Sequence, residues 1–99
     1  MLYVDRLFPA LPKGQAKRHG TLWCHLWPAD SDTKGLIELH RVARQIGLKR
    51  AYFQNHKWFP HYDLTPSKRV LAIEQGAIEK DLAEWITEKG GLRALCKPS

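Results

Sequence analysis

The chain has 99 residues, enough for one domain with a modest core, and its content of 43% apolar and 26% charged residues is typical of globular rather than disordered proteins. No apolar run is long enough to cross a bilayer and the N-terminus lacks a signal-peptide pattern, so we expect a cytoplasmic protein without a membrane partner. The net charge of +6 favours a phosphate-bearing partner, either a phosphorylated small molecule such as a nucleotide or a nucleic acid.

The N-terminal third predicts two strands separated by a loop. Apolar and polar residues alternate over residues 1–7, which predicts a first strand with Asp5 near its end. Residues 9–20 are rich in proline, glycine and basic side chains and predict a loop. A second strand is predicted over 21–27, and its two largely apolar faces are typical of a central strand. His25 interrupts one face near the strand end, where open α/β sheets bind ligands.

The middle of the chain predicts a helix and then a short strand. The helix begins after Asp32 or Thr33 and ends near Gly47. His40 falls within its apolar stripe, where a hydrogen-bonded core histidine is more common than a ligand. A third strand is predicted over residues 50–54.

An aromatic and basic segment follows this strand. Between Glu38 and Asp63 the chain has no acidic residue, although it has several basic ones. The loop over residues 55–60 contains Trp58 and Phe59. If these rings are exposed they can stack on a base, and if they are buried they cover the end of the sheet. Both alternatives stay open.

Residues 58–69 predict a loop that leads into a second helix. Thr65 is a favourable N-cap, and Pro66 occupies the first helical position, where proline is tolerated. A helix start presents unpaired N–H groups and a partial positive charge, and here Lys68 and Arg69 add two cations. The start of this helix is therefore a predicted anion site, with the alternative that it is an ordinary cap among solvated charges.

The C-terminal part predicts a short strand over residues 77–80 and a third helix capped by Asp81. Gly90 and Gly91 end this helix, and residues 91–99 are expected to fray. The predicted core contains Leu22, Leu26, Leu36, Leu39, Ala43, Ile46, Phe53, Val70, Ile73, Trp85 and Ile86.

This order of elements predicts a single α/β domain over residues 1–99, with the core in residues 1–90. We expect a small layered structure with a short, partly parallel sheet of three or four strands and three helices. In that arrangement five side chains gather at one edge of the sheet: Asp5, His25, His61, Asp63 and Arg69.

Several short motifs together resemble one known family. They are Cys24-His25-Leu26, Glu38-Leu39-His40, Ile46-Gly47-Leu48, Phe53, His61-Tyr62-Asp63, Arg69 and Gly76-Ala77. The combination resembles the domain of unknown function 4031, a small family of phages and bacteria. The resemblance implies the order of elements and marks His25, His61, Asp63 and Arg69 as family-motif positions. It implies no activity.

Two hypotheses of different class fit these residues. In the favoured one, the domain binds a phosphorylated ligand at the second helix start, which His61 and Asp63 line. Thr65, Lys68 and Arg69 hold the phosphate while Trp58 or Phe59 stacks on a base. It is favoured because an anion site at a helix start does not depend on tertiary geometry.

The alternative is a phosphoesterase or nuclease. His25 and His61 act as general base and acid, Asp63 or Asp5 orients them or holds a divalent metal, and Arg69 stabilises developing charge. The chain has no glycine-rich phosphate loop and no H-E-x-x-H motif. A third alternative is a protein-interaction domain with no ligand, so whether the protein is an enzyme stays open.

Overall fold

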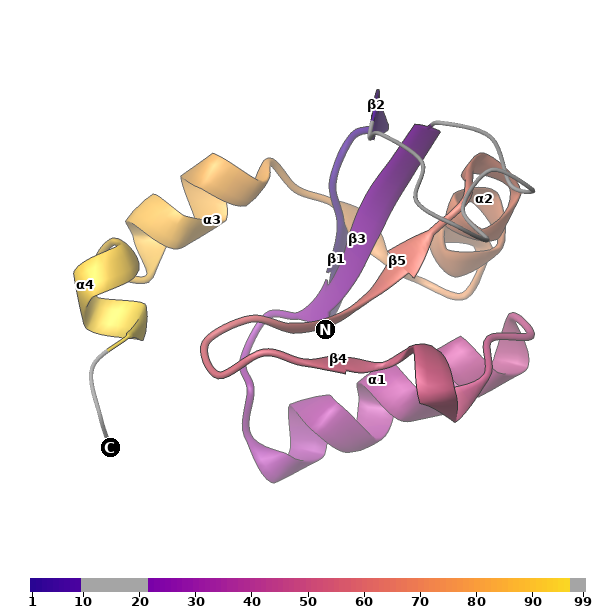
Figure 1. The fold of residues 1–99 in the computed structure, drawn as a ribbon, viewed down its shortest axis with the longest axis horizontal. Coiled ribbons are helices and arrows are strands. Elements are labelled where there is room, and N and C mark those ends of the chain that lie inside the picture. Colours follow the sequence, from indigo (N-terminus) through magenta and orange to yellow (C-terminus); the bar gives the residue numbers. More distant parts are fainter. Residues whose placement is uncertain (10–21, 97–99) are drawn as a thin grey trace.

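The computed structural model describes residues 1–9 and 22–96. The elements in chain order are β1 (Leu2–Val4), β2 (Phe8–Pro9), β3 (Leu22–Pro28), α1 (Thr33–Gln45), the 3-10 turn η2 (Arg50–Tyr52), β4 (Gln54–Asn55), β5 (Pro60–Leu64), α2 (Pro66–Glu74), β6 (Ile78–Glu79), α3 (Leu82–Glu88) and α4 (Leu92–Leu95). Figure 1 shows α1 and α2 beside the sheet and α3 and α4 extending to the left. The predicted α/β class is confirmed.

The six strands form one mixed sheet in the order β4-β5-β3-β1-β6, with β2 paired to β3 off this path. Strand β3 is central, as predicted, and pairs antiparallel with both β1 and β5. Among the described strands only β1 and β6 are parallel neighbours. The predicted number of three or four strands and three helices was too low, because β2, β4 and α4 are too short to leave a periodic signal.

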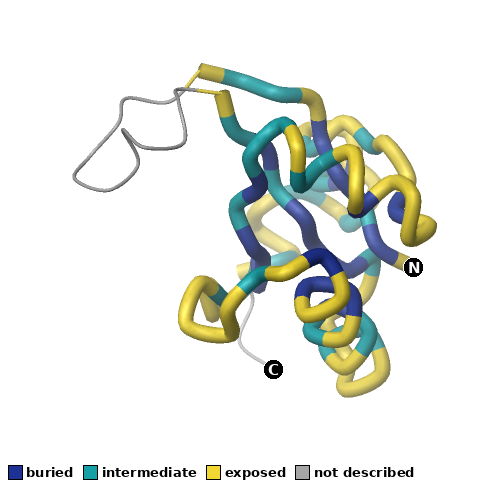
Figure 2. Tube along the Cα trace, turned by 90° about the vertical axis from the view of Figure 1, so that its right-hand side faces the viewer, coloured by how far each residue is buried: buried dark blue, intermediate teal, exposed yellow. Residues whose placement is uncertain are grey.

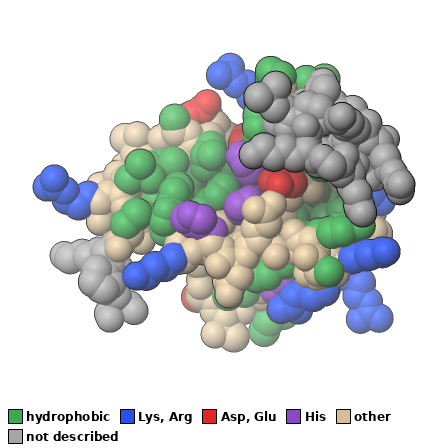
Figure 3. Space-filling model, in the orientation of Figure 1, with side chains coloured by type: hydrophobic (Ala, Val, Ile, Leu, Met, Phe, Trp, Pro, Cys, Tyr) green, Lys and Arg blue, Asp and Glu red, His purple; other side chains and the backbone are tan. Residues whose placement is uncertain are grey.

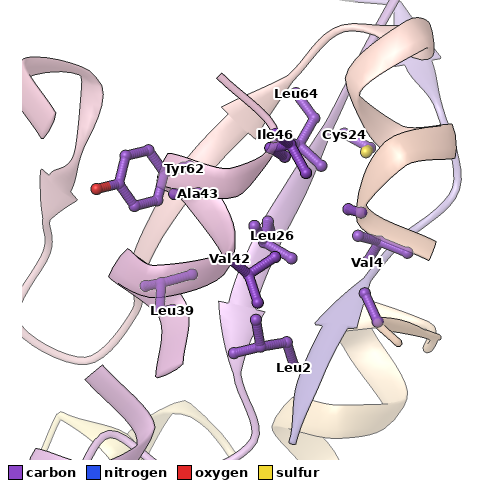
Figure 4. Packing of buried hydrophobic residues seen from close by; sticks show 12 residues of the cluster. Leu2, Val4, Cys24, Leu26, Leu39, Val42, Ala43, Ile46, Tyr62 and Leu64 are labelled. Carbon is purple, nitrogen blue, oxygen red and sulfur yellow. The ribbon is translucent and has the colours of Figure 1, made fainter. Parts of the chain in front are cut away.

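The main core lies between the sheet and helices α1 and α2. The pleat sends alternate residues of β3 and β5 to this side, among them Cys24, Leu26, Tyr62 and Leu64, all fully buried. Figure 4 shows Leu26 and Leu64 of the strands facing Val42 and Ile46 of the helix. The buried parts of the chain in Figure 2 concentrate in these strands and on the inner side of the helices.

The opposite face of the sheet is covered by α3 at one end. Trp27, Phe59 and Trp85 form a second buried cluster there, with their ring centroids 5.5–6.1 Å apart. The Trp85 indole N–H donates to the carbonyl of Ala29 over 3.3 Å, which ties α3 to the end of β3. The rest of this face carries the polar residues described below.

The predicted helix starts are confirmed, because each cap is local in sequence. Asp32 accepts from the backbone N–H of Gly35 over 2.8 Å, and Asp81 accepts from that of Glu84 over 2.8 Å. Thr65 accepts from the N–H of Lys68 over 3.4 Å at the start of α2. Gly47 has φ +88°, the left-handed conformation expected just after a helix end.

Two predictions about residues 50–64 were wrong. Residues 50–52 form the turn η2 rather than a strand, and pairing begins only at Gln54. Residues 60–64, predicted as a loop, form the strand β5, which pairs with β3 on one side and β4 on the other. Pro60 is tolerated because it is the first residue of the strand. Pairing on both sides therefore overrode the turn signal of the proline.

Three predicted core residues are exposed. Val70 and Ile73 are 55% and 36% exposed, because α2 contacts the sheet through Ala72, one position away from the predicted stripe. Leu22 is exposed as the first residue of β3, where it pairs with Pro9 of the two-residue strand β2. Most of the loop predicted over residues 9–20 lies outside the described residues. No helix in the described part of the chain is long and apolar enough to span a membrane.

The first prediction tests the core between α1 and the sheet. Leu39 is fully buried there, so Leu39→Ala should lower the free energy of unfolding by about 2–5 kcal/mol through lost contacts and a cavity. Ile37, on the same helix, is 64% exposed, and Ile37→Ala serves as the matched control with a change within about 0.5 kcal/mol. Urea unfolding followed by circular dichroism measures both. Similar losses for the two variants would contradict this packing of α1.

Candidate functional site

Two histidines and two aspartates meet on the sheet face opposite α1 and α2. His25 of β3 is the Cα partner of Asp63 in β5, and His61 lies two residues before Asp63 on the same side of that strand. The His25 and His61 rings are nearly perpendicular, with centroids 5.1 Å apart. Figure 3 shows histidine side chains gathered beside acidic ones near the middle of this face. Four of the five side chains predicted to gather thus lie together, but on a face of the inner strands rather than at an edge of the sheet. The fifth, Arg69, instead donates to the carbonyl of Asp5 and to Glu79.

His25 is fixed by Asp5, which follows β1. The Asp5 carboxylate accepts from the backbone N–H of His25 over 2.6 Å and from its Nδ1 over 2.7 Å. Because a carboxylate can only accept, Nδ1 carries a proton, and in the neutral tautomer the lone pair is therefore on Nε2. The ring is also stacked on Phe8, with centroids 5.1 Å apart. His25 therefore presents Nε2 to the site in a defined orientation.

His61 is oriented in the same way by a different acceptor. Its Nδ1 donates to the backbone carbonyl of Phe59 over 2.7 Å, and its ring stacks on the Phe59 ring with centroids 4.5 Å apart. The Nε2 atom of His61 then faces the Asp63 carboxylate at 3.4 Å. With Nδ1 already a donor, either a proton or a cation must lie between Nε2 and that carboxylate.

Asp63 is held as an anion. Burial of its carboxyl group acts to raise its pKa, but the hydrogen bond and charge of His61, the charge of His25 and the Gln54 amide outweigh burial, so the pKa lies below the ordinary value of 3.8. Gln54 of β4 donates from its side-chain amide to the second carboxylate oxygen of Asp63. The carboxylate is thus charged and oriented at neutral pH.

Three of these residues have the composition and spacing of a metal site. One ligand atom each from His25, His61 and Asp63 lie within 4.8 Å of one another. Across the described ranges, no other group of three His, Cys, Asp or Glu side chains meets in this way. Metal centres typically have acceptors that fix each histidine ligand through its other ring nitrogen, and here Asp5 and the Phe59 carbonyl occupy that position.

Cys24, next to His25, takes no part in this chemistry. Its side chain points to the opposite face of the sheet, into the main core. Burial, and then the charge of Asp5, raises the pKa of its thiol to about 12. It is therefore a packing residue and not a nucleophile at neutral pH.

The family comparison agrees with the motifs in the sequence. A family model described as "Protein of unknown function (DUF4031)" matches residues 9–89. The chain belongs to this family. No curated protein and no solved structure matches it. The matched segment of the DUF4031 domain includes His25, His61 and Asp63, whereas Asp5 lies just before it.

The residues predicted to hold phosphate at the start of α2 have structural partners in this DUF4031 domain. The Lys68 ammonium donates to the carbonyl of Ile46 over 2.6 Å, at the end of α1. Arg69 donates to the carbonyl of Asp5 over 2.8 Å and pairs with Glu79 over 3.1 Å. Thr65 caps the helix. These contacts assign both cations to the packing of α2.

The two aromatic residues of the aromatic loop (residues 55–60) lie in different environments. Phe59 is buried under His61 and α3, whereas Trp58 is half-buried and stacks on Phe59 with centroids 5.5 Å apart. The Trp58 and His56 rings are nearly perpendicular, with centroids 5.0 Å apart. His40 forms a hydrogen bond through Nδ1 with the Tyr62 hydroxyl over 2.9 Å. It therefore has the predicted role of a hydrogen-bonded core histidine rather than that of a ligand.

Sequence reasoning missed three contributors to this DUF4031 site: Gln54, Phe8 and the Phe59 carbonyl. The alternation of His61 and Asp63 with buried Tyr62 and Leu64 is a strand signal that would have placed both polar residues on one face. Gln54 and Phe8 sit in two-residue strands, where no periodic signal exists. Their roles arise only from strand pairing.

The lowered pKa of Asp63 gives a pH test. Because the pKa is lower in the folded than in the unfolded protein, the stabilisation by the ionised carboxylate is full above the ordinary value of 3.8 and is lost as the pH falls through the lowered value. The difference in free energy of unfolding between wild type and Asp63→Asn should therefore shrink as the pH is lowered from about 5 to about 2. Urea titrations at several pH values measure this difference in free energy. A difference that does not change with pH would contradict a lowered pKa of Asp63 in the folded protein.

Proposed function

We propose that this protein is a divalent-metal-dependent hydrolase of phosphoesters, with His25, His61 and Asp63 as the metal ligands. The observation that carries the proposal is the convergence of their three ligand atoms within 4.8 Å, with both histidines anchored through Nδ1. Two imidazoles and one carboxylate form a ligand set that suits zinc, iron and related transition metals and leaves positions open for water and substrate.

The distances support this ligand set. Donor atoms around a tetrahedral ion with bonds of about 2.1 Å lie about 3.4 Å apart. His61 Nε2 and Asp63 Oδ1 are already at 3.4 Å. A cation bound between this nitrogen and this oxygen replaces the proton that would otherwise bridge them.

The surrounding residues act on the ligands rather than on the substrate. Asp5 increases the basicity of His25 and fixes its ring, and the Phe59 carbonyl does the same for His61. Gln54 holds one oxygen of Asp63 and so leaves the other for the ion. A divalent ion bound here supplies a charge that polarises a phosphoryl oxygen and promotes ionisation of water. In the overall reaction water adds to phosphorus, the ester P–O bond breaks, and the alcohol leaves with a proton.

A phosphoester is the substrate class that the charge of the protein favours. The chain has a net charge of +6, which draws anions to its surface. We prefer this proposal to phosphate binding at the start of α2, because Lys68 and Arg69 are engaged within the fold.

Metal binding is tested by isothermal titration calorimetry of the chelator-stripped protein with Zn²⁺ and with Mn²⁺. We expect one ion per chain, with release of a proton on binding, and loss of saturable binding in His25→Ala and His61→Ala. His56→Ala is the matched control, because His56 is exposed on the aromatic loop. Unchanged binding in His25→Ala would contradict the site.

Hydrolysis is tested with bis(p-nitrophenyl) phosphate and p-nitrophenyl phosphate, followed by the absorbance of p-nitrophenolate. We expect turnover that depends on added metal, disappears in His61→Ala and persists in His56→Ala. Metal binding without turnover of either ester or of an oligonucleotide would contradict the hydrolase and leave the metal site intact.

Asp5→Asn tests the orienting contact on its own. The amide can present its NH₂ group rather than an oxygen to Nδ1, which disturbs the tautomer of His25. Metal affinity should fall by about 10–100-fold, the usual effect of losing such a partner. Thermal unfolding checks that the variant is folded, and an affinity equal to that of wild type would show that Asp5 does not support the site.

A further inference from the structure

A second feature lies on the α1 side of the sheet, away from the histidine pair. It is a groove of about 640 Å³ between α1 and the turn η2. Its lining includes Arg41, Arg44 and Arg50 at the rim, with His40, Gln45 and Tyr62. We call it the arginine groove. Three of its side chains are guanidinium groups and none is a carboxylate.

The arginines of this groove differ from other cations of the protein in their partners. Lys80 pairs with Glu84 and Glu88, and Lys89 with Asp30. Arg41, Arg44 and Arg50 form no ion pair with any carboxylate among the described residues; Arg41 donates to the neutral amide of Gln45. Three uncompensated positive charges around one concavity produce a local field that favours an anion with several charges.

The floor of the groove is fixed and neutral. Tyr62 bonds to His40 over 2.9 Å, and the His40 ring packs edge-on against Phe53 with centroids 4.5 Å apart. Burial, and then the charge of Arg50, lowers the pKa of His40, so the imidazole is uncharged at neutral pH. The Arg50 guanidinium lies over the Phe53 ring, 5.6 Å from its centroid. The positive charge is therefore at the rim, where a ligand can reach it.

We propose that the arginine groove binds the sugar–phosphate backbone of a nucleic acid strand, which makes an oligonucleotide the substrate class of the hydrolase. The assignment of an oligonucleotide as the substrate rests on the proposed function, whereas the binding of nucleic acid by the groove does not. Guanidinium groups bind phosphate oxygens in pairs, and several of them along one groove suit a polymer of phosphates better than a single nucleotide.

The position and surroundings of the groove favour a single strand. Tyr52, next to Arg50, is 54% exposed and offers a ring on which a base can stack. The groove and the metal site lie on opposite faces of β5, with Tyr62 lining the groove and its neighbours His61 and Asp63 forming the metal site. Strand β4, next to β5, is the edge of the sheet around which a bound strand would pass from one to the other. In Figure 3, basic side chains gather over the lower right of the molecule, and the histidines lie near the centre of the same view.

The test is fluorescence anisotropy with a labelled single-stranded DNA oligonucleotide, in buffer with EDTA so that no metal-dependent cleavage occurs. Arg44→Ala and Arg50→Ala should each weaken binding about tenfold, as expected for lost charged hydrogen bonds. Each should also reduce the slope of log Kd against log salt concentration by about one. Arg93→Ala, an exposed arginine on α4, is the charge-matched control and should bind as wild type does.

The proposal would be overturned by no binding of the oligonucleotide by wild type, by equal affinity of Arg44→Ala and wild type, or by an equal loss in Arg93→Ala. Tighter binding of a labelled poly-glutamate peptide than of the oligonucleotide would also overturn it, in favour of an acidic protein partner. Circular dichroism confirms folding, which these exposed positions should not disturb. The anisotropy assay measures binding and needs no turnover, so a failure of the hydrolase assay would not affect its result. Likewise, a failure to bind the oligonucleotide would not affect the result of the hydrolase assay.

Discussion

The antiparallel pairing of β3 with β5 is the constraint on which the rest of the structure depends. Its register places His25 opposite Asp63 and Leu26 opposite Tyr62. A shift by one residue would turn every side chain of one strand to the other face. The buried Leu26, Tyr62 and Leu64 fix the register by their packing against α1 and α2, and the polar residues between them must then meet on the opposite face. The core thus positions the site.

The two faces of β5 have different chemistry because they meet different neighbours. On one face Tyr62 reaches His40 and the arginine groove, and on the other His61 and Asp63 meet His25. The site side is bounded by Phe59 and Trp27, whose packing under Trp85 of α3 sets the position of the Phe59 carbonyl. The aromatic cluster thus supports the site in two ways: the Phe59 carbonyl orients His61, and the Phe59 ring stacks on the His61 ring.

Several basic residues that look alike in the sequence have different roles in the structure. Lys68 caps the end of α1 through the carbonyl of Ile46, and Arg69 joins the end of β1 to Glu79. Arg41, Arg44 and Arg50 instead surround a groove. The difference follows from local geometry: the first two come from the start of α2, which packs against the sheet, and the others lie on the outer surface of α1 and η2. Net charge alone cannot separate these roles.

The sequence by itself determined the α/β class, the central strand β3, the caps Thr65 and Asp81, and the choice of Asp5, His25, His61 and Asp63 as candidate site residues. These depend on local periodicity, capping and residue type, which a single segment displays. Tertiary structure decided that residues 60–64 form a strand, that α2 buries Ala72 instead of Val70, and that Gln54 and the Phe59 carbonyl serve the site. Those outcomes come from pairing and packing between distant segments, and such interactions have no local signal in the chain.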